Sequence, residues 1–202
     1  MVLLSTAYFP PIEYMHYILS GNQICIEAHE NFSKQTYRNR CTIVTANGAL
    51  DLSVPLINEG NKTLITEKKI SYSEPWQVKH WRAIESAYNS SPYFEFFEEE
   101  IKSVILKEHE FLFELNKQSL QSILNILRVK VDIACTTEYL IVPQNTIDIR
   151  SSISPKEKSR NNLPAYYQPF SVRNGFIANA SMLDLLFNEG LGASSYLKKL
   201  NF

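Results

Sequence analysis

The chain has 202 residues, and its 45% hydrophobic and 20% charged residues are typical of a globular protein and unlike a disordered segment. Its 20 Lys and Arg against 21 Asp and Glu give a formal net charge of -1, which excludes the global positive excess that attracts nucleic acid. The length predicts a single domain over residues 1–202, because one hydrophobic core serves chains of up to roughly 250 residues.

Residues 1–28 predict a strand, a helix and a second strand. Residues 2–9 are a short apolar run that meets two prolines, and residues 12–19 carry apolar side chains at helical spacing. Residues 23–28 again have the length and pattern of a strand. This order predicts a βαβ unit, whose two strands lie parallel when the crossover is right-handed.

The next elements are a hairpin and a further strand. Two apolar runs, residues 41–45 and 49–56, flank Asn47-Gly48, which is the strongest short-range signal for a β-hairpin. Residues 63–71 follow a polar turn and predict another strand.

Three helices and a strand are predicted in the middle of the chain. The first helix begins at Pro75 and ends before Pro92, the second covers about 93–107, and the third about 111–127. Residues 129–135 then have the apolar character of a buried strand.

The C-terminal part begins with a polar, proline-containing segment at about residues 145–164, which predicts an exposed loop. A helix follows, with Ser181 and Asp184 at capping-box spacing and Gly190 at its end, before a short final helix. The predicted fold class is therefore α/β, with an N-terminal βαβ unit, an added β-hairpin, a helical middle and a helical C-terminal tail.

Several features favour a cytoplasmic location. Cys25, Cys41 and Cys135 are odd in number and far apart, without a C-x-x-C pair, as expected of reduced thiols. The N-terminus lacks the basic start and long apolar stretch of a signal peptide. No run of about 18 apolar residues occurs, so membrane insertion is not expected.

A basic segment with Lys34, Arg38 and Arg40 follows the second predicted strand. In open α/β sheets ligands bind beyond the carboxyl ends of parallel strands, and an arginine fork matches phosphate or carboxylate. These three residues are therefore predicted to bind an anionic substrate. The alternative is a solvated turn entering the hairpin, in which an arginine pairs with a neighbouring carboxylate.

Lys79 and His80 share faces of the first middle helix with Ala83 and Ile84, which are expected to point inward. Their predicted catalytic roles are to hold an anion and to act as a general acid or base near neutral pH. The alternative places Lys79 at the edge and makes His80 a core histidine with satisfied hydrogen bonds.

Gln168 lies among Tyr166, Tyr167 and Phe170, which could form an aromatic wall with a polar group for a sugar or a base. Packing of the tail against the body, or contact between copies of a homo-oligomer, explains the same residues. No glycine-rich phosphate loop, hydrolase elbow or zinc motif occurs, and no metal site is predicted.

The order of the motifs resembles the WbqC-like family. The matching residues are Tyr8-Phe9-Pro10; Phe32, Lys34, Tyr37, Arg38, Asn39 and Arg40; Trp76, Lys79-His80, Tyr88 and Pro92-Tyr93-Phe94; Ile153-Ser154-Pro155-Lys156; Tyr167-Gln168-Pro169-Phe170; Gly175-Phe176; Asn179; and the run from Asp184 to Gly190. The resemblance covers nearly the whole chain. It departs from the family at Ser5-Thr6-Ala7, where many members carry His-Gln-Pro before the first Tyr.

The family is associated with bacterial surface-polysaccharide gene clusters. The resemblance therefore implies a transferase or substrate-activating enzyme that binds an anionic activated small molecule, such as a nucleotide or sugar nucleotide, with Tyr8 among its binding residues. A noncatalytic binding or scaffold protein of the same pathway is the alternative, which Ser5-Thr6-Ala7 favours. The βαβ opening with a later Lys-His pair also resembles nucleotidyl-transfer enzymes of the HUP type. Neither resemblance specifies a cofactor.

Overall fold

The computed structural model describes residues 1–58, 62–142, 144–156 and 162–200. Its main sheet has the strand order β5-β2-β1-β6, and every neighbouring pair is parallel. These strands are β1 (Val2–Ser5), β2 (Ile24–Glu27), β5 (Ile133–Cys135) and β6 (Ile147–Asp148). An antiparallel hairpin consists of β3 (Arg40–Thr45) and β4 (Gly48–Ser53). The predicted α/β class, with its βαβ opening and added hairpin, is confirmed.

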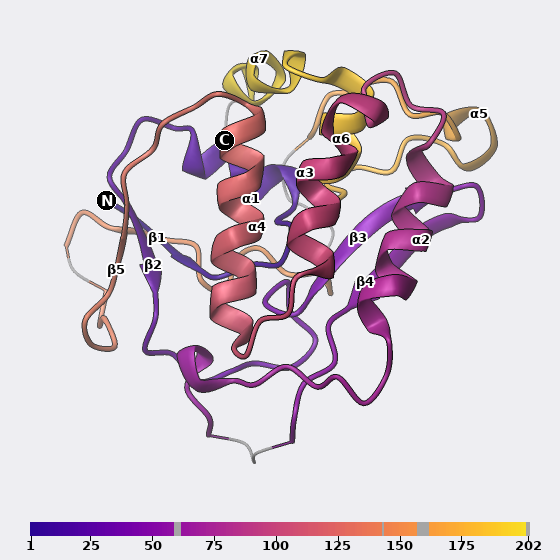
Figure 1. Cartoon of the computed structure of the whole chain (residues 1–202). Coiled ribbons are helices and arrows are strands. Elements are labelled where there is room, and N and C mark those ends of the chain that lie inside the picture. Colours follow the sequence, from indigo (N-terminus) through magenta and orange to yellow (C-terminus); the bar gives the residue numbers. More distant parts are fainter. Residues whose placement is uncertain (59–61, 143, 157–161, 201–202) are drawn as a thin grey trace.

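Seven α-helices and one 3₁₀ helix accompany the sheets within the described residues. They are α1 (Ile12–Ile18), η1 (Ile65–Glu67), α2 (Trp76–Tyr88), α3 (Phe94–Leu106), α4 (Leu112–Ile126), α5 (Ser171–Asn174), α6 (Met182–Glu189) and α7 (Gly192–Lys199). The middle helices α2, α3 and α4 pack in succession, and the tail helices α6 and α7 contact α1 (Figure 1). None of the described helices is both long enough and apolar enough to cross a membrane.

β1 is shorter than the apolar run that predicts it. The chain leaves the sheet after Ser5, and the side chains of Tyr8 and Phe9 are fully buried in the core. Phe9 has a φ of 37°, and the N–H of Tyr8 donates to Tyr37 O at 2.9 Å. The apolar pattern therefore indicated burial correctly, whereas the backbone conformation after Ser5 depends on contacts with a distant segment.

Two other predicted strands differ from the structure. Residues 63–71 form η1 with isolated bridges at Leu64 and Ile70 instead of a continuous strand. Of residues 129–135, only Ile133–Cys135 join the sheet. In both segments the apolar residues are explained by packing against the core, which a helical turn or an irregular chain also achieves.

The polar segment at about residues 145–164 contains a strand that its sequence does not predict. Ile147 and Asp148 of β6 pair with Val2 and Leu3 of β1. Two residues are too few to show a strand period, and their partner lies at the other end of the chain. Residues 157–161 of this segment lie outside the described part of the chain.

The strand order places a crossover point beside β1. The chain passes from β1 to β2 and outward to β5, and then returns to the opposite side of β1 as β6. In open α/β sheets ligands bind beyond the carboxyl ends of the strands at such a point. In this protein that position is the edge formed by Ser5 of β1 and Asp148 of β6.

Ser181 caps α6 as predicted and also ties the tail to the segment after β1. Its Oγ accepts from the N–H of Leu183 (3.3 Å) and donates to Phe9 O (2.8 Å), and the residue is 1% exposed. Ser181→Ala is expected to lower the free energy of unfolding by about 1 to 2 kcal/mol, because two buried backbone groups lose their partner. Urea denaturation measures this, with the exposed Ser103→Ala of α3, expected within about 0.5 kcal/mol of wild type, as the control. Equal midpoints for the two variants would show that the cap contributes nothing.

Candidate functional site

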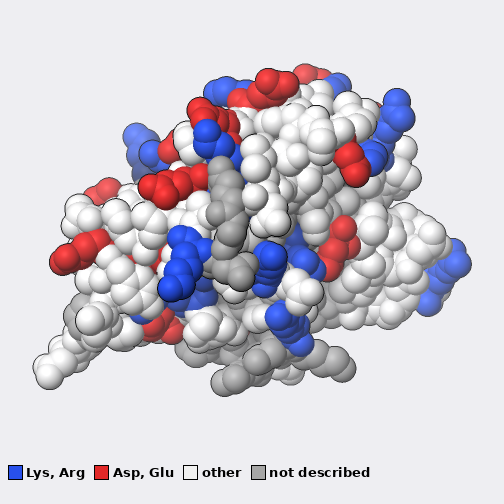
Figure 2. Space-filling model, turned by 90° about the horizontal axis from the view of Figure 1, so that it is seen from below, with Lys and Arg blue, Asp and Glu red and all other residues white. Residues whose placement is uncertain are grey.

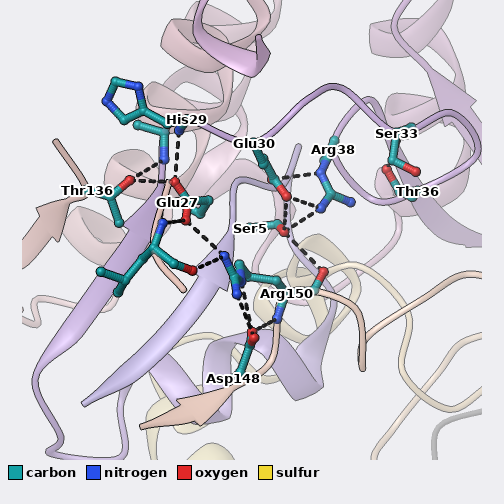
Figure 3. A network of polar contacts seen from close by, with 12 residues as sticks. Ser5, Glu27, His29, Glu30, Ser33, Thr36, Arg38, Thr136, Asp148 and Arg150 are labelled. Atoms are coloured by element: carbon teal, nitrogen blue, oxygen red, sulfur yellow. Dashed lines mark hydrogen bonds and ion pairs between the residues drawn. The ribbon is translucent and has the colours of Figure 1, made fainter. Parts of the chain in front are cut away.

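A buried ion pair between Glu30 and Arg38 lies at the carboxyl edge of the main sheet (Figure 3). Arg38 Nε donates to Glu30 Oε1 at 2.8 Å and Nη2 donates to Oε2 at 2.5 Å, so the guanidinium holds both carboxylate oxygens. Arg38 Nη2 also donates to Ser5 Oγ at the end of β1 (2.5 Å). This two-point geometry compensates for the hydration that the buried charges lose. The pair joins the segment after β2 to β1.

Glu27 is a second charged centre, at the end of β2. Its carboxylate accepts hydrogen bonds from Thr136 Oγ1 (2.6 Å), the N–H groups of His29 (2.9 Å) and Leu140 (3.0 Å), and Arg150 Nη1 (2.9 Å). Burial raises the pKa of Glu27, but these hydrogen bonds and the Arg150 charge lower it by more than burial raises it. The pKa therefore lies below its ordinary value. Glu27 is therefore a carboxylate near neutral pH.

Arg150 links this centre to the end of β6. Its Nε and Nη2 donate to the two oxygens of Asp148 at 3.0 and 2.8 Å, and Nη1 donates to Glu27 and to Leu140 O. All three nitrogens of the guanidinium therefore have partners. By contrast, no described residue accepts a hydrogen bond from Arg38 Nη1. Arg38 thus retains one donor group for a ligand.

Two adjoining cavities open at this edge of the sheet. The larger, the α4 cavity, has a volume of about 250 Å³ and lies between α4 and strands β2 and β5, next to the turn after β1. The smaller, the Arg38 cavity, has about 20 Å³, the room for one water molecule, and is lined by Ser5, Arg38 and Arg150 among others. Thr6, Ala7 and Tyr14 line both cavities. We refer to these two cavities, on either side of the shared residues, as the crevice.

The α4 cavity combines apolar walls with a few polar groups. Its lining includes Ile26, Phe113, Asn116, Lys117, Asp132 and Cys135. Asn116 Nδ2 donates to Arg38 O at 2.7 Å, whereas its Oδ1 is buried without a partner among the described residues. Lys117, Asp132 and Cys135 are exposed. The cavity can therefore recognise an apolar ring with a polar edge and a charged extension.

Tyr8 and His80 contact each other inside the protein core. His80 Nε2 lies 3.2 Å from Ser53 O, which can only accept, so Nε2 carries the proton and Nδ1 accepts from Tyr8 OH at 3.1 Å. Trp76 packs edge-on against the imidazole, with 5.0 Å between the ring centroids. Burial lowers the pKa of His80 to about 4, although the hydrogen bond to Ser53 raises it. His80 is thus neutral near pH 7, and its environment is that of a core histidine with satisfied hydrogen bonds.

Lys79 lies on the exposed side of the same helix. Its Nζ is 2.7 Å from Glu74 Oε2, and 61% of its side chain is exposed. The buried imidazole of His80 and the exposed ammonium of Lys79 therefore face different surroundings. Their predicted catalytic roles stay predictions.

The other predicted cations lie on the hairpin side of the molecule. Arg40 Nη1 is 3.3 Å from Asp51 Oδ2 on the neighbouring strand, and Lys34 is exposed. Both line a shallow depression with Phe32 and Pro55. Figure 2 shows basic side chains gathered near the centre of the lower face, with acidic side chains around them.

Arg38 is thus the predicted binding residue that lines the crevice, whereas the described linings of its two cavities do not include Tyr8, Lys34, Arg40 or Gln168.

Gln168 is buried in the tail. Its Nε2 donates to Asp184 Oδ2 (2.8 Å) and Ile177 O (3.0 Å), and Tyr166 OH also donates to Asp184. The carboxylate of Asp184, which capping-box spacing assigned to the helix end, therefore binds tail side chains, and burial raises its pKa. Tyr166 is part of this packing, whereas Tyr167 is 58% exposed. The aromatic residues of the tail do not share one exposed patch.

The residues that the structure adds to the site are Ser5, Glu27, His29, Glu30, Asn116, Lys117 and Arg150. One signal was available, because Glu27 and Glu30 stand at the end of a predicted strand, where ligands bind in open sheets. No local signal marks Asn116 or Lys117, which look like ordinary polar positions of an amphipathic helix. Within the described residues, no group of three or more His, Cys, Asp and Glu side chains could hold a metal ion.

Comparisons with known proteins agree with these motifs. The model of the WbqC-like protein family matches residues 6–163. The chain is 23% identical to an uncharacterized protein of Mycobacterium tuberculosis, Rv1507c, over 98% of this chain and 97% of that protein. No solved structure matches it significantly. The family match spans most of the chain and includes every residue that lines the two cavities except Ser5. The chain therefore belongs to the WbqC-like protein family.

Proposed function

We propose that this protein is a cytoplasmic transferase or substrate-activating enzyme of bacterial surface-polysaccharide biosynthesis that binds an anionic activated small molecule, such as a nucleotide or sugar nucleotide. One observation carries the proposal: the α4 and Arg38 cavities adjoin at the turn that follows the carboxyl end of β1, beside the crossover between β1 and β6. Ligands of open α/β sheets bind at this position. The association of the family with surface-polysaccharide gene clusters supports the pathway.

The charges around the crevice support an anionic group near Lys117. The guanidinium groups of Arg38 and Arg150 are largely neutralised by buried carboxylates. Lys117 lines the α4 cavity, is exposed, and forms no ion pair with any residue that the structure describes. An unpaired ammonium attracts phosphate more strongly than a guanidinium that already holds a carboxylate. The free Nη1 of Arg38 adds a donor at the other end of the crevice.

A noncatalytic binding protein of the same pathway is the second candidate. Two observations favour it: Arg38 and Arg150 make structural ion pairs with buried carboxylates, and His80 is enclosed in the core as a neutral imidazole. His29 follows β2, and Figure 3 shows its ring pointing away from the ionic network. The two candidates share the ligand and differ only in turnover.

A thermal-shift experiment tests the proposal. A nucleotide or sugar nucleotide at about ten times its Kd is expected to stabilise the protein by about 1.4 kcal/mol, which raises Tm by roughly 3 to 6 °C. Lys117→Glu is expected to weaken this binding roughly tenfold, because it replaces attraction by repulsion. The matched control is Lys199→Glu on α7, which makes the same charge change away from the crevice and is expected to keep the shift.

The thermal shift tests the ligand site, and a conversion assay separates the two candidates. A shift that falls to roughly a third in Lys117→Glu and is unchanged in Lys199→Glu supports a ligand site in the crevice. No shift with any nucleotide or sugar nucleotide, or an undiminished shift in Lys117→Glu, contradicts the proposal. Conversion of the bound sugar nucleotide in the presence of a bacterial extract, followed by chromatography, supports the enzyme, and binding without conversion supports the noncatalytic protein.

A further inference from the structure

The α4 cavity has the size of one ring system. Its volume of about 250 Å³ lies below the roughly 300 to 1,000 Å³ of pockets that bury a drug-sized ligand. A complete sugar nucleotide is larger than such a pocket, so only part of it fits inside. The remainder has to extend into the open part of the crevice, past Thr6 and Ala7 or out toward Lys117.

The walls of the α4 cavity favour a flat aromatic ring over a sugar ring. Ile26, Phe113, Leu120, Leu124 and Ile133 form the apolar part of the wall, and polar side chains such as Thr6 and Gln121 stand beside it. A hexose carries hydroxyl groups all around its ring, and those that face the apolar side chains lose their hydration without gaining partners. A nucleobase has two apolar faces that pack against these side chains, and it confines its polar atoms to the ring edge.

Thr6 supplies a polar partner for that edge. The residue is 4% exposed and lines both cavities. Its hydroxyl has no hydrogen-bond partner among the described residues, and it is not closed off from solvent as Asn116 Oδ1 is. A hydroxyl both donates and accepts, so it can bond to an N–H group, a ring nitrogen or a carbonyl oxygen of a base.

We propose that the α4 cavity is a nucleobase subsite, in which the base lies between α4 and strands β2 and β5 and its polar edge bonds to the Thr6 hydroxyl. The inference rests on the proposed function, because it names the part of the anionic ligand that enters the cavity. The phosphate groups lie outside this subsite.

Cys135 provides a direct readout of occupancy. It lines the α4 cavity and is exposed, whereas Cys25 and Cys41 are buried. A maleimide at about pH 8 therefore labels Cys135 first, and mass spectrometry identifies the modified residue. A base in the cavity blocks access to this thiol. At about ten times its Kd, a nucleoside diphosphate is expected to slow the labelling of Cys135 roughly tenfold. A sugar 1-phosphate and inorganic diphosphate, which lack a base, are expected to leave the rate unchanged.

Two variants at the same position extend the test. Cys135→Trp fills the mouth of the cavity and is expected to weaken nucleoside diphosphate binding, measured by calorimetry, at least roughly tenfold. Cys135→Ser keeps the cavity and is expected to bind like wild type. The Tm of each ligand-free variant shows whether it is folded, and the labelling experiment on the wild-type protein needs no variant.

The possible failures are distinguishable. A nucleoside diphosphate that raises Tm, leaves Cys135 labelling unchanged and binds Cys135→Trp normally overturns the nucleobase subsite but leaves the proposed function standing. Protection of Cys135 by the sugar 1-phosphate and not by the nucleoside diphosphate also overturns it. If no nucleotide or sugar nucleotide raises Tm, the proposed function fails and the subsite with it.

Discussion

Arg38→Met is expected to lower the free energy of unfolding by about 3 to 5 kcal/mol, because it leaves the Glu30 carboxylate buried without its counter-charge. Glu30 is 8% exposed, and both of its oxygens accept from the Arg38 guanidinium. The substitution also removes the donor to Ser5 Oγ at the end of β1. Methionine keeps the packing of the arginine methylene groups, so the expected loss of stability comes from the unpaired carboxylate and the lost hydrogen bonds.

Urea denaturation of three variants checks this expectation. Lys79→Met breaks an exposed pair with Glu74 and is the matched control, with an expected change of about 0 to 1 kcal/mol. The double variant with Arg38→Met and Glu30→Leu removes both charges, and it is expected to recover most of the lost stability. If Arg38→Met changed stability as little as Lys79→Met, the pair would be solvated and would not hold the crevice together.

Lowering the pH from about 7 to about 5 is expected to reduce the free energy of unfolding by about 2 kcal/mol through His80 alone. The pKa of His80 is about 4 in the folded protein, because burial disfavours the imidazolium, and it is about 6.5 in the unfolded chain. The unfolded chain therefore takes up the proton first as the pH falls. The contribution of His80 is fully present above pH 6.5 and is lost as the pH falls toward 4.

Denaturation at both pH values tests this dependence. His80→Gln is expected to lower stability at pH 7 but to remove most of the decline between about pH 7 and about pH 5. His109→Gln is the matched control: the pKa of His109 is also lowered by burial, but less strongly, so most of the decline is expected to remain. Glu27 and Asp148 have lowered pKa values and lose their contribution only at lower pH. An equal decline in wild type and His80→Gln would contradict the assignment.

The sequence predicted the elements whose signal is local. The βαβ opening, the Asn47-Gly48 hairpin, the three middle helices and the Ser181 cap are each encoded by neighbouring residues, through apolar period, turn chemistry or capping. The basic segment after the second strand was also recognisable, and Arg38 within it reaches the crevice.

The sequence did not predict which side chains contact each other. Helical periodicity placed Lys79 and His80 near one face, but only packing shows that His80 is enclosed by Trp76 and Tyr8 while Lys79 pairs with Glu74 in solvent. Likewise Gln168 stands in an aromatic motif, yet its amide binds the buried Asp184. A residue type and its spacing indicate what a side chain can do, whereas its burial decides what it does.

The sequence by itself determined the α/β class, the order of most elements and the resemblance to the WbqC-like family, because these depend on local patterns and on motif order. Only the tertiary structure decided the site. β6 is too short to show a period, and it exists because Ile147 and Asp148 pair with the first strand of the chain. That pairing creates the crossover beside β1, and the crevice brings Thr6, Arg38, Asn116, Cys135 and Arg150 together from distant segments. Contacts between residues so far apart leave no local pattern, so the physical basis of the candidate site lies in the packing of the sheet against α4.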